Sequence, residues 1–360
     1  MPALALDQPN FQGNLDFCTV NERGRLVDAF KVEFVITTED GVTQKFPSSG
    51  RANVTTVGKL STGRYWVYNT VSSQAFAPTV VGGFAADTRY RVTWYWRTLE
   101  ADVEQSLAQY FDVTAASGTR LDFVQYATIV DVRREGITSA TLSDSAIIQG
   151  IRRWQPMVDR FCRQFFYPRR IEMRLDGREA RLLMMPLPII GVETVQINDT
   201  GYDLSSDDWV AQTMFGYPDG RRNPHIAFAT GRQQSIYSAP AVTGRLSRFS
   251  YGNYNQLIKG MFGFVDDSFQ TPSLVSRAML RLLLYQATPL AVGGGSSNIG
   301  PAGVLTVEKT DGHERHYAWP DRGPSLDYKV FGDAEVIELL NFHKAPLVIR
   351  ASSSPEYGAI

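Results

Sequence analysis

The strongest constraint on the fold of this chain is a change in the spacing of its hydrophobic residues partway along the sequence. Up to about Val113, apolar and polar residues alternate in several short stretches, such as KVEFVITT from Lys31 and RYRVTWYWR from Arg89. From Ile147 onward the apolar residues recur every three or four positions. The first period is typical of strands with one buried face and the second of a helix with one buried stripe. The chain is therefore predicted to begin with a β region and to continue with mixed α and β structure.

The first hundred residues predict an antiparallel β-sandwich of immunoglobulin-like type. The stretches are rich in Val, Tyr, Trp and Thr, and turn residues such as Glu39-Asp40-Gly41 and Ser61-Thr62-Gly63 separate them. Regular short strands with frequent turns are typical of such sandwiches. A chain of 360 residues is long for one domain. We expect the sandwich to span residues 1–118, with the sequence AASGTR from Ala115 as its linker.

The next region is predicted to open with two helices. The first follows Tyr126 and stops at Gly136, and the second has a capped start at Ser143 or Asp144 and runs to about Phe166. Pro156 lies inside the second helix, so a kink or a break near Gln155 is expected. The apolar stripe of this helix comprises Ile147, Ile151, Trp154, Val158, Phe161 and Phe165.

A small antiparallel sheet and two further helices are expected to complete this second domain. The period returns to two after Pro168, which predicts a hairpin turned near Asp176-Gly177 and a further strand from Val192. The turn-rich residues 216–240 predict an ordered loop or insertion. Later elements are a last strand before LIKGMFGF, a helix started by Thr271-Pro272 and stopped by Pro289, a strand pair around residues 305–318, and a helix from Asp333 to Phe342.

The predicted class is thus a multidomain α+β protein. The β-sandwich domain of residues 1–118 is followed by a helical domain with a small antiparallel sheet at residues 119–343, and by an extended C-terminal tail at residues 344–360. The segment from Tyr126 to Phe342 contains its own apolar stripe, so we expect it to fold without residues 1–120.

No set of residues in the sequence predicts catalysis, a cofactor or a metal site. His313 and His316 lack the spacing of a metalloprotease and an evident third ligand, so a solvated turn is expected there. His343 is expected to bond the terminal carbonyls of its helix. The pairs Asp207-Asp208 and Asp266-Asp267 lie beside turns, where capping is the usual role. No phosphate-binding glycine loop or nucleophile elbow occurs. We therefore expect a protein that is not an enzyme.

Charge and cysteine content limit the partners and the compartment. Lys and Arg number 36 against 37 Asp and Glu, so the chain as a whole has no electrostatic attraction to nucleic acid or to anionic membranes. Arginine pairs at Arg133, Arg152, Arg169 and Arg221 favour salt bridges between subunits at least as much as phosphate contacts. The distant Cys18 and Cys162 are expected to be free thiols. Without a basic, apolar leader, the chain is expected to be a cytoplasmic protein with no membrane contact.

The order of elements from Tyr126 onward resembles the head-tail connector, or adaptor, family of tailed bacteriophages and related gene transfer agents. No single motif is specific, and the signal comes from the order of four stretches over about two thirds of the chain. The region of residues 1–120 is a departure from the usual compact family member. The four stretches are YATIVDVRREG with the helix ending FCRQFFYPRR, LLMMPLPIIGVETVQINDTGYDLSSDDWV, KGMFGFVDDSFQTPSLVSRAMLRLLLYQATP and YKVFGDAEVIELLNFHKAPLVIR.

The resemblance implies an adaptor domain in a virion structural protein of the phage neck. Such a protein would form a ring, expected to be a dodecamer of identical subunits, that docks under the portal protein, receives the next neck or tail protein and continues the DNA channel. Genome DNA would pass through without sequence recognition. The protein would be made in the host cytoplasm and end in the virion. Its C-terminal end would reach the portal, so the expected partner-binding residues are Pro346, Leu347, Val348, Ile349 and Arg350, in a tail that is mobile in the free subunit and strand-like on the portal.

An alternative is a β-sandwich recognition module for capsid decoration or glycan binding. In that case the aromatic N-terminal domain would be the working part. An exposed, concave platform of Trp66, Trp94 or Trp96 would favour it.

Overall fold

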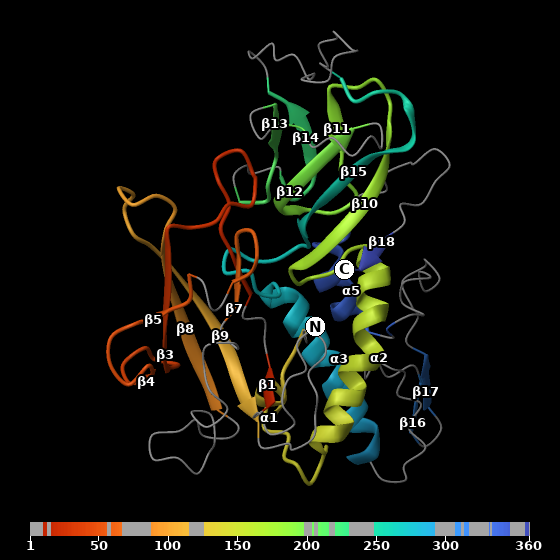
Figure 1. Cartoon of the computed structure of the whole chain (residues 1–360). Helices are drawn as coiled ribbons and strands as arrows, with labels where there is room; N and C mark the ends of the chain where they lie inside the picture. Colours follow the sequence, from red (N-terminus) through yellow and green to blue (C-terminus); the bar gives the residue numbers. More distant parts are fainter. Residues whose placement is uncertain are drawn as a thin grey trace, which may run out of the picture.

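The structure is a computed structural model of a β-rich chain with three groups of elements (Figure 1). A β region made from the start of the chain lies beside a group of helices, and two further sheets lie above the helices in the view of Figure 1. The residues that the structure describes are 10–12, 16–55, 59–66, 88–114, 126–197, 204, 208–215, 220–229, 248–291, 307–310, 313–316, 331, 333–345 and 357–359.

The N-terminal region consists of two antiparallel sheets. A six-stranded sheet has the order β1-β9-β8-β3-β4, with β5 also paired to β3, and a three-stranded sheet has the order β2-β7-β6. The predicted alternation is confirmed in β8, where Tyr90, Val92 and Trp94 are buried between less buried neighbours. The immunoglobulin-like arrangement stays a prediction. The strands are β1 (Asn10–Gln12), β2 (Asp16–Cys18), β3 (Lys31–Thr38), β4 (Gln44–Phe46), β5 (Ala52–Asn53), β6 (Lys59–Ser61), β7 (Arg64–Trp66), β8 (Thr88–Arg97) and β9 (Gln105–Thr114).

The described helices are α1 (Ile129–Arg134), α2 (Asp144–Cys162), α3 (Ser273–Ala291) and α5 (Ala334–Asn341). The starts of α2 and α5 follow the predicted signals. Ser143 caps α2 by accepting the Ala146 N–H, and Asp333 caps α5. The helix α2 is continuous through Pro156, so the expected break is absent. It ends at Arg163, whose φ of 58° terminates the helical backbone before Phe165.

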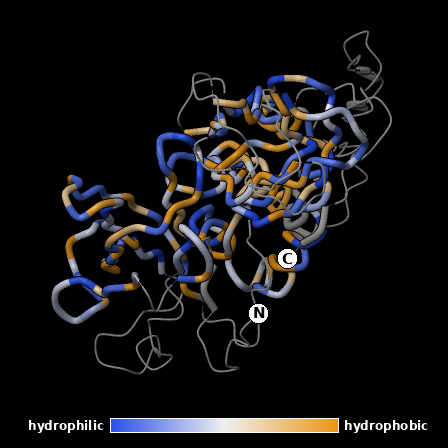
Figure 2. Tube along the Cα trace, turned by 45° about the horizontal axis from the view of Figure 1, so that its top comes forward, coloured by the Kyte–Doolittle hydropathy of each residue, from blue (hydrophilic) through white to orange (hydrophobic). Residues whose placement is uncertain are grey.

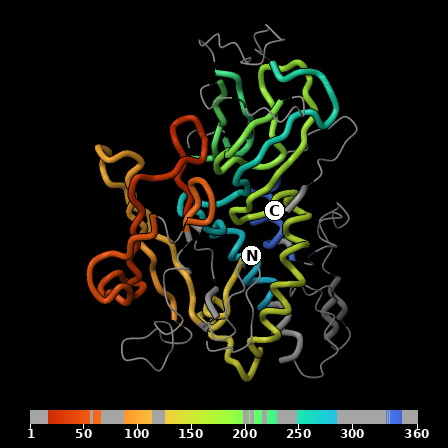
Figure 3. The backbone as a smooth tube through the Cα atoms, in the orientation of Figure 1, coloured from red at the N-terminus to blue at the C-terminus, as the bar shows by residue number. Residues whose placement is uncertain are grey.

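The predicted stripe of α2 forms the middle of a helical core. Its residues Ile147, Ile151 and Val158 are fully buried, together with side chains of α1, α3 and α5. The helix α3 contacts both α2 and α5 (Figure 3). It also continues to Ala291, past the expected stop at Pro289. The hydroxyl of Thr271 donates to the Phe166 carbonyl at 2.9 Å and so fixes the chain before α3 to the end of α2.

Two antiparallel sheets enclose a separate hydrophobic core that includes Met173, Val195 and Ile226. The hairpin expected near Asp176-Gly177 is wrong. The strand β10 does not pair with the strand that follows it. It pairs along its length with β15, in an antiparallel register that places Arg169 opposite Phe262. The next strand, β11, pairs instead with β14. The order of the first sheet is β12-β15-β10-β18 and that of the second is β11-β14-β13. The strands are β10 (Arg169–Gly177), β11 (Leu182–Met184), β12 (Ile189–Ile197), β13 (Trp209–Ala211), β14 (His225–Phe228), β15 (Gly252–Phe262) and β18 (Tyr357–Ala359).

The structure also bears on the loop expected at residues 216–240 and on the strand pair expected after α3. The residues expected to form a loop at 216–240 include β14, which is the central strand of its sheet. The predicted strand pair at 305–318 is confirmed as β16 (Val307–Thr310) and β17 (His313–His316). The linker at 115–120 and the glycine-rich residues 293–298 lie outside the described residues.

The N-terminal region shares a hydrophobic core with the second part of the chain. Phe17 stacks on Trp94 with ring centroids 5.1 Å apart and meets Phe269 edge-on at 6.1 Å. Ile190, Met214, Met261 and Val265 belong to the same buried cluster. In Figure 2, many hydrophobic segments lie toward the middle of the tube, and several of the outer turns are hydrophilic. Independent folding of the segment from Tyr126 to Phe342 stays a prediction, and removal of residues 1–120 would expose these apolar side chains.

Backbone hydrogen bonds reinforce this shared core. Leu26 donates its N–H to the Val192 carbonyl and Val192 donates to the Gly24 carbonyl, both at 2.8 Å. Residues 24–26 thereby extend the sheet beyond β12. Gly191 leaves room for Leu26 here, because a Cβ at this position would lie 2.8 Å from the Leu26 Cδ2 atom and the leucine side chain would have to shift.

We predict that Leu26→Asp lowers the free energy of unfolding of the whole chain by at least about 4 kcal/mol, because an unpaired carboxylate would be buried against β12. Leu26 is 2 % exposed. Chemical denaturation followed by circular dichroism measures the change. The matched control is Phe30→Asp at a side chain that is 53 % exposed, and this variant should stay within about 1 kcal/mol of the parent. Equal effects of the two substitutions would contradict the shared core.

Candidate functional site: the charged junction between the N-terminal sheet and the helices

A buried ion pair lies where the N-terminal sheet meets α1. Arg89 of β8 and Asp112 of β9 are directly opposite each other in the antiparallel ladder. The guanidinium binds the carboxylate through two hydrogen bonds, from Nε to Oδ1 at 2.7 Å and from Nη2 to Oδ2 at 2.8 Å. Asp112 is fully buried. Two parallel bonds of this kind fix both direction and distance, so the pair sets the position of the next group in the network.

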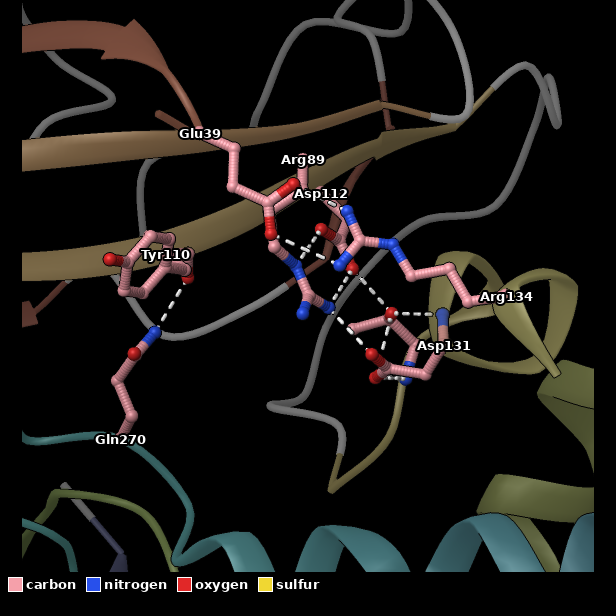
Figure 4. A network of polar contacts seen from close by, with 8 residues as sticks. Glu39, Arg89, Tyr110, Asp112, Asp131, Arg134 and Gln270 are labelled. Atoms are coloured by element: carbon pink, nitrogen blue, oxygen red, sulfur yellow. Dashed lines mark hydrogen bonds and ion pairs between the residues drawn. The ribbon is translucent and has the colours of Figure 1, made fainter. Parts of the chain in front are cut away.

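The same arginine reaches the first turn of α1 (Figure 4). Its Nη2 atom lies 2.6 Å from Oδ1 of Asp131, and the Thr128 hydroxyl donates to Asp112. Thr128 is also the N-cap of α1. Its side chain accepts the Asp131 N–H at 3.1 Å, while the Asp131 carboxylate accepts the Thr128 N–H at 2.9 Å. The capping box of the helix and the ion pair of the sheet are therefore one network.

An outer ion pair closes the junction toward solvent. Arg134, at the end of α1, donates to both carboxylate oxygens of Glu39, which follows β3. The two side chains are 47 % and 45 % exposed. Hydrogen bonding to Arg134 lowers the pKa of Glu39 below its usual range. An exposed pair of this kind contributes little to stability, so the inner pair dominates the junction.

Burial and pairing have opposite effects on the inner carboxylate. Burial raises the pKa of Asp112, while the hydrogen bonds and charge of Arg89 act to lower it. The hydrogen bonds to Asp112 raise the pKa of Arg89, so the guanidinium stays charged. An ionised carboxylate at this depth needs its partner, because desolvation without a counter-charge costs several kcal/mol.

A second set of polar contacts joins β9 to the segment that leads into α3. The buried Gln109 side chain accepts the Trp94 indole N–H at 2.8 Å and donates to the Ser268 carbonyl at 2.9 Å. Gln270 donates from its amide to the Tyr110 carbonyl at 2.6 Å (Figure 4). The sheet is thus fixed to the start of both α1 and α3.

The polar contacts of this junction fix the position of the N-terminal sheet relative to α1. Each carboxylate of the network accepts hydrogen bonds from an arginine, a hydroxyl or a backbone N–H, so none is placed as a free base beside a nucleophile. The arrangement holds the N-terminal sheet and the helices of the chain in a fixed relation. The sequence analysis did not identify this junction. The spacing of Thr128 and Asp131 is a capping-box signal that could have indicated part of it. The charges of Arg89 and Asp112 face each other only because their strands pair.

The residues expected to bind the portal, Pro346 to Arg350, lie outside the described residues. The described residues on either side of them are held in place. Ala345 donates its N–H to the Cys162 carbonyl at 2.9 Å, and β18 pairs with β10, with Ile171 opposite Ala359. The expectation of a wholly mobile tail is therefore wrong for Tyr357–Ala359. Pairing with β18 gives hydrogen-bond partners to backbone N–H and C=O groups on the edge of β10 that faces away from β15.

The histidines are dispersed. His225 lies on β14, while His313 and His316 lie on β17 rather than in the expected turn. The expected role of His343 is wrong. Its ring packs edge-on against Phe166 and Phe264, its nitrogens have no hydrogen-bond partner among the described residues, and burial lowers its pKa. Within the described ranges, no group of three or more His, Cys, Asp or Glu side chains is placed to hold a metal ion.

Acidic pairs and arginine pairs are mostly engaged within the chain. Asp266 accepts the N–H groups of Ser268 and Gln270 at 2.8 Å, as expected for a turn cap. Asp267 pairs with Arg221 at 2.7 Å. Arg133 binds Asp144, and Arg170 binds Glu193 at 2.9 Å. Asp207 lies outside the described residues.

The aromatic and thiol side chains fit structural roles. Trp94 is fully buried and Trp96 packs against the core, so neither forms the exposed platform considered above. The side chain of Trp66 is outside the described set. Cys18 and Cys162 are not joined in a disulfide, as predicted, and both are buried.

Comparisons with known proteins give little similarity. No family model and no curated protein matches the chain. A search of solved structures finds a chain from the neck of an empty gene transfer agent (GTA) particle, computed with C6 symmetry. The match covers 61% of this chain and 90% of that one, at 13% identity and a TM-score of 0.33, which is too low to show a shared fold. No helix in the described part of the chain is long and apolar enough to cross a membrane.

We predict that Arg89→Leu lowers the free energy of unfolding by about 3–5 kcal/mol, because it leaves the buried Asp112 carboxylate without a counter-charge. Urea denaturation measures the change. Arg134→Leu removes the same charge from the exposed pair and should cost about 1 kcal/mol or less. The double replacement of Arg89 and Asp112 by leucine should recover most of the loss. A cost of Arg89→Leu no larger than that of Arg134→Leu would show that the inner pair does not hold the junction.

We also predict a pH-dependent stability at the end of α2, where burial raises the pKa of Asp159 to about 6. The Tyr126 hydroxyl donates to this carboxylate and accepts the Phe166 N–H at 2.9 Å. The folded state holds the proton more tightly than the unfolded chain, whose aspartate pKa is about 4. The Asp159 contribution is therefore largest below about pH 4, falls as the pH rises to about 6 and is constant above. Melting temperatures across this range, for the parent and for Asp159→Asn, measure it, and an unchanged profile in the variant would contradict the assignment.

Proposed function

We propose that this chain is a structural protein of the neck of a tailed bacteriophage or related gene transfer agent. One observation carries the proposal. The helices α1, α2, α3 and α5 of the segments that resemble the adaptor family fold around one helical core. The sheet of β10, β12 and β15 has a core of its own, and its strands lie between α2 and α3 in the chain, in the family order. Segments as distant as Ile129 and Leu340 contribute to the helical core, so the order of elements is a property of the tertiary structure as well as of the sequence.

The charged junction supports a structural role. A subunit of a ring that transmits force from a packed head to a tail must keep its parts in a fixed relation. Here the buried pair of Arg89 and Asp112 and the capping box of α1 fix the N-terminal sheet to the helices. The proposal includes no catalytic activity and no cofactor.

In the proposed assembly twelve copies form a closed ring. Each copy presents one surface to the next, as cyclic symmetry requires. The ring docks under the portal protein, receives a tail or further neck protein below, and surrounds the DNA channel. The protein is made in the host cytoplasm and is carried into the virion. The rival function as a recognition module has less support, because Trp94 is buried in the core.

The direct test is electron microscopy of the full chain mixed with its cognate portal. The proposal requires a ring of this protein beneath the portal with twelvefold density. Absence of any complex in negative-stain images and in analytical ultracentrifugation would refute it.

We predict that the portal contact depends on the apolar run of the tail. Leu347→Asp combined with Ile349→Asp should abolish co-sedimentation with the portal without a change in melting temperature, because charged side chains would replace the apolar contacts. The control is a chain ending after Glu356, which lacks β18 but keeps Pro346 to Arg350, and it should still bind. Undiminished portal binding by the double variant would refute this role of the tail.

A further inference from the structure

The solvent face of α2 carries a row of arginines. Arg152, Arg153, Arg160 and Arg163 are all exposed, and they lie opposite the buried Val158. On a helix, these positions fall within a sector of about 100° around the axis. At about 1.5 Å per residue, the row is roughly 16 Å long. A chain of net charge -1 thus has one strongly basic helix face.

Carboxylates of the described residues leave three arginines of this row without an ion pair. Arg153, Arg160 and Arg163 form no ion pair with any described residue. The two acidic residues of α2 are engaged elsewhere, Asp144 with Arg133 and Asp159 with Tyr126.

The neighbouring helix shows the opposite pattern. Arg281 of α3 binds both Asp333 and Glu335 of α5, and Arg277 binds Glu335. Arginines on α3 thus serve packing between helices. Arg153, Arg160 and Arg163 of α2 have no such use within the described part of the chain.

Helix stability accounts for only part of the row. Basic side chains in the last turn interact favourably with the helix dipole, which explains Arg160 and Arg163. Arg152 and Arg153 lie in the middle of α2, where this effect has vanished. The guanidinium of Arg153 lies 5.3 Å from the centroid of the Trp154 ring, a contact that leaves its N–H donors available.

Charge complementarity favours a polyanion as the partner. Double-stranded DNA presents a charge about every 1.7 Å along its axis, and arginine binds phosphate oxygens through paired N–H donors. A second copy of the chain is the other possibility, but the described surface lacks a matching acidic row. Its exposed carboxylates without an ion pair are scattered over separate elements, among them Glu22, Glu100, Glu135 and Glu338.

We infer that the arginine face of α2 binds the phosphates of double-stranded DNA without reading its sequence. The inference rests on the proposed neck function, in which DNA passes through the ring. It identifies the residues of each subunit that contact this DNA. In the ring the contact is repeated in every subunit, so weak individual contacts add up around the duplex. The face would hold the last packaged DNA in the neck.

The test uses the full chain and a fluorescent duplex of mixed sequence, with anisotropy read as a function of salt. The variant combines Arg153→Gln, Arg160→Gln and Arg163→Gln. We expect its affinity at low salt to fall by about tenfold or more. The slope of log K against log salt should shrink by up to about 2.7, because each phosphate that is no longer neutralised reduces it by about 0.9. The matched control removes three exposed arginines elsewhere, by Arg178→Gln, Arg181→Gln and Arg222→Gln, and should keep the parent affinity and slope.

Other outcomes overturn the inference. It fails if the parent does not bind the duplex, or if the two triple variants lose affinity equally. It also fails if the α2 variant loses binding to polyglutamate but keeps binding to DNA, because the face would then serve an acidic protein. Ring formation with the portal is recorded for the same variant. A variant that forms rings and binds DNA normally refutes the inference alone, while a parent that binds DNA through α2 but never joins a portal refutes the neck function alone.

Discussion

The structure depends on one buried carboxylate, that of Asp112. An ionised group at this position would be unstable in an apolar interior, so its solvation must come from the protein. Two donors supply it: Arg89 on the adjacent strand and Thr128 at the start of α1. Because one donor belongs to the sheet and the other to the helix, the group cannot be satisfied unless both elements are in place. A buried polar group is a poor source of stability, but it is a strong determinant of which arrangement is stable.

Apolar packing and backbone pairing act in the same direction as this charge. Phe17 and Phe269 meet across the boundary between the two parts of the chain, and the backbone of Gly24 and Leu26 pairs with Val192. Each contact is local, but a rotation of the described N-terminal region against the rest of the chain would break several of them at once. Such rigidity suits the structural role proposed above.

Local signals in the sequence predicted the helices well. Ser143, Gly136 and Asp333 mark helix ends through capping and backbone geometry, and these effects act over only a few residues. Strand partners were harder, because β10 finds its partner in β15, far along the chain, and an alternating pattern does not reveal which edge it will meet. The junction was missed for the same reason. Arg89 and Asp112 are unremarkable as single residues, and only the register of β8 with β9 brings them together.

Gly191 shows what this construction means for the exchange of parts between proteins. Its missing side chain leaves space for Leu26, so two segments far apart in the sequence must match in shape at that point. A graft of the N-terminal sheet onto another protein would need room for Leu26 there, an apolar ring at the place of Phe269, and a threonine cap facing the buried carboxylate. The region is therefore not a portable module, and chimeric chains with a boundary near residue 120 would inherit mismatched surfaces on both sides.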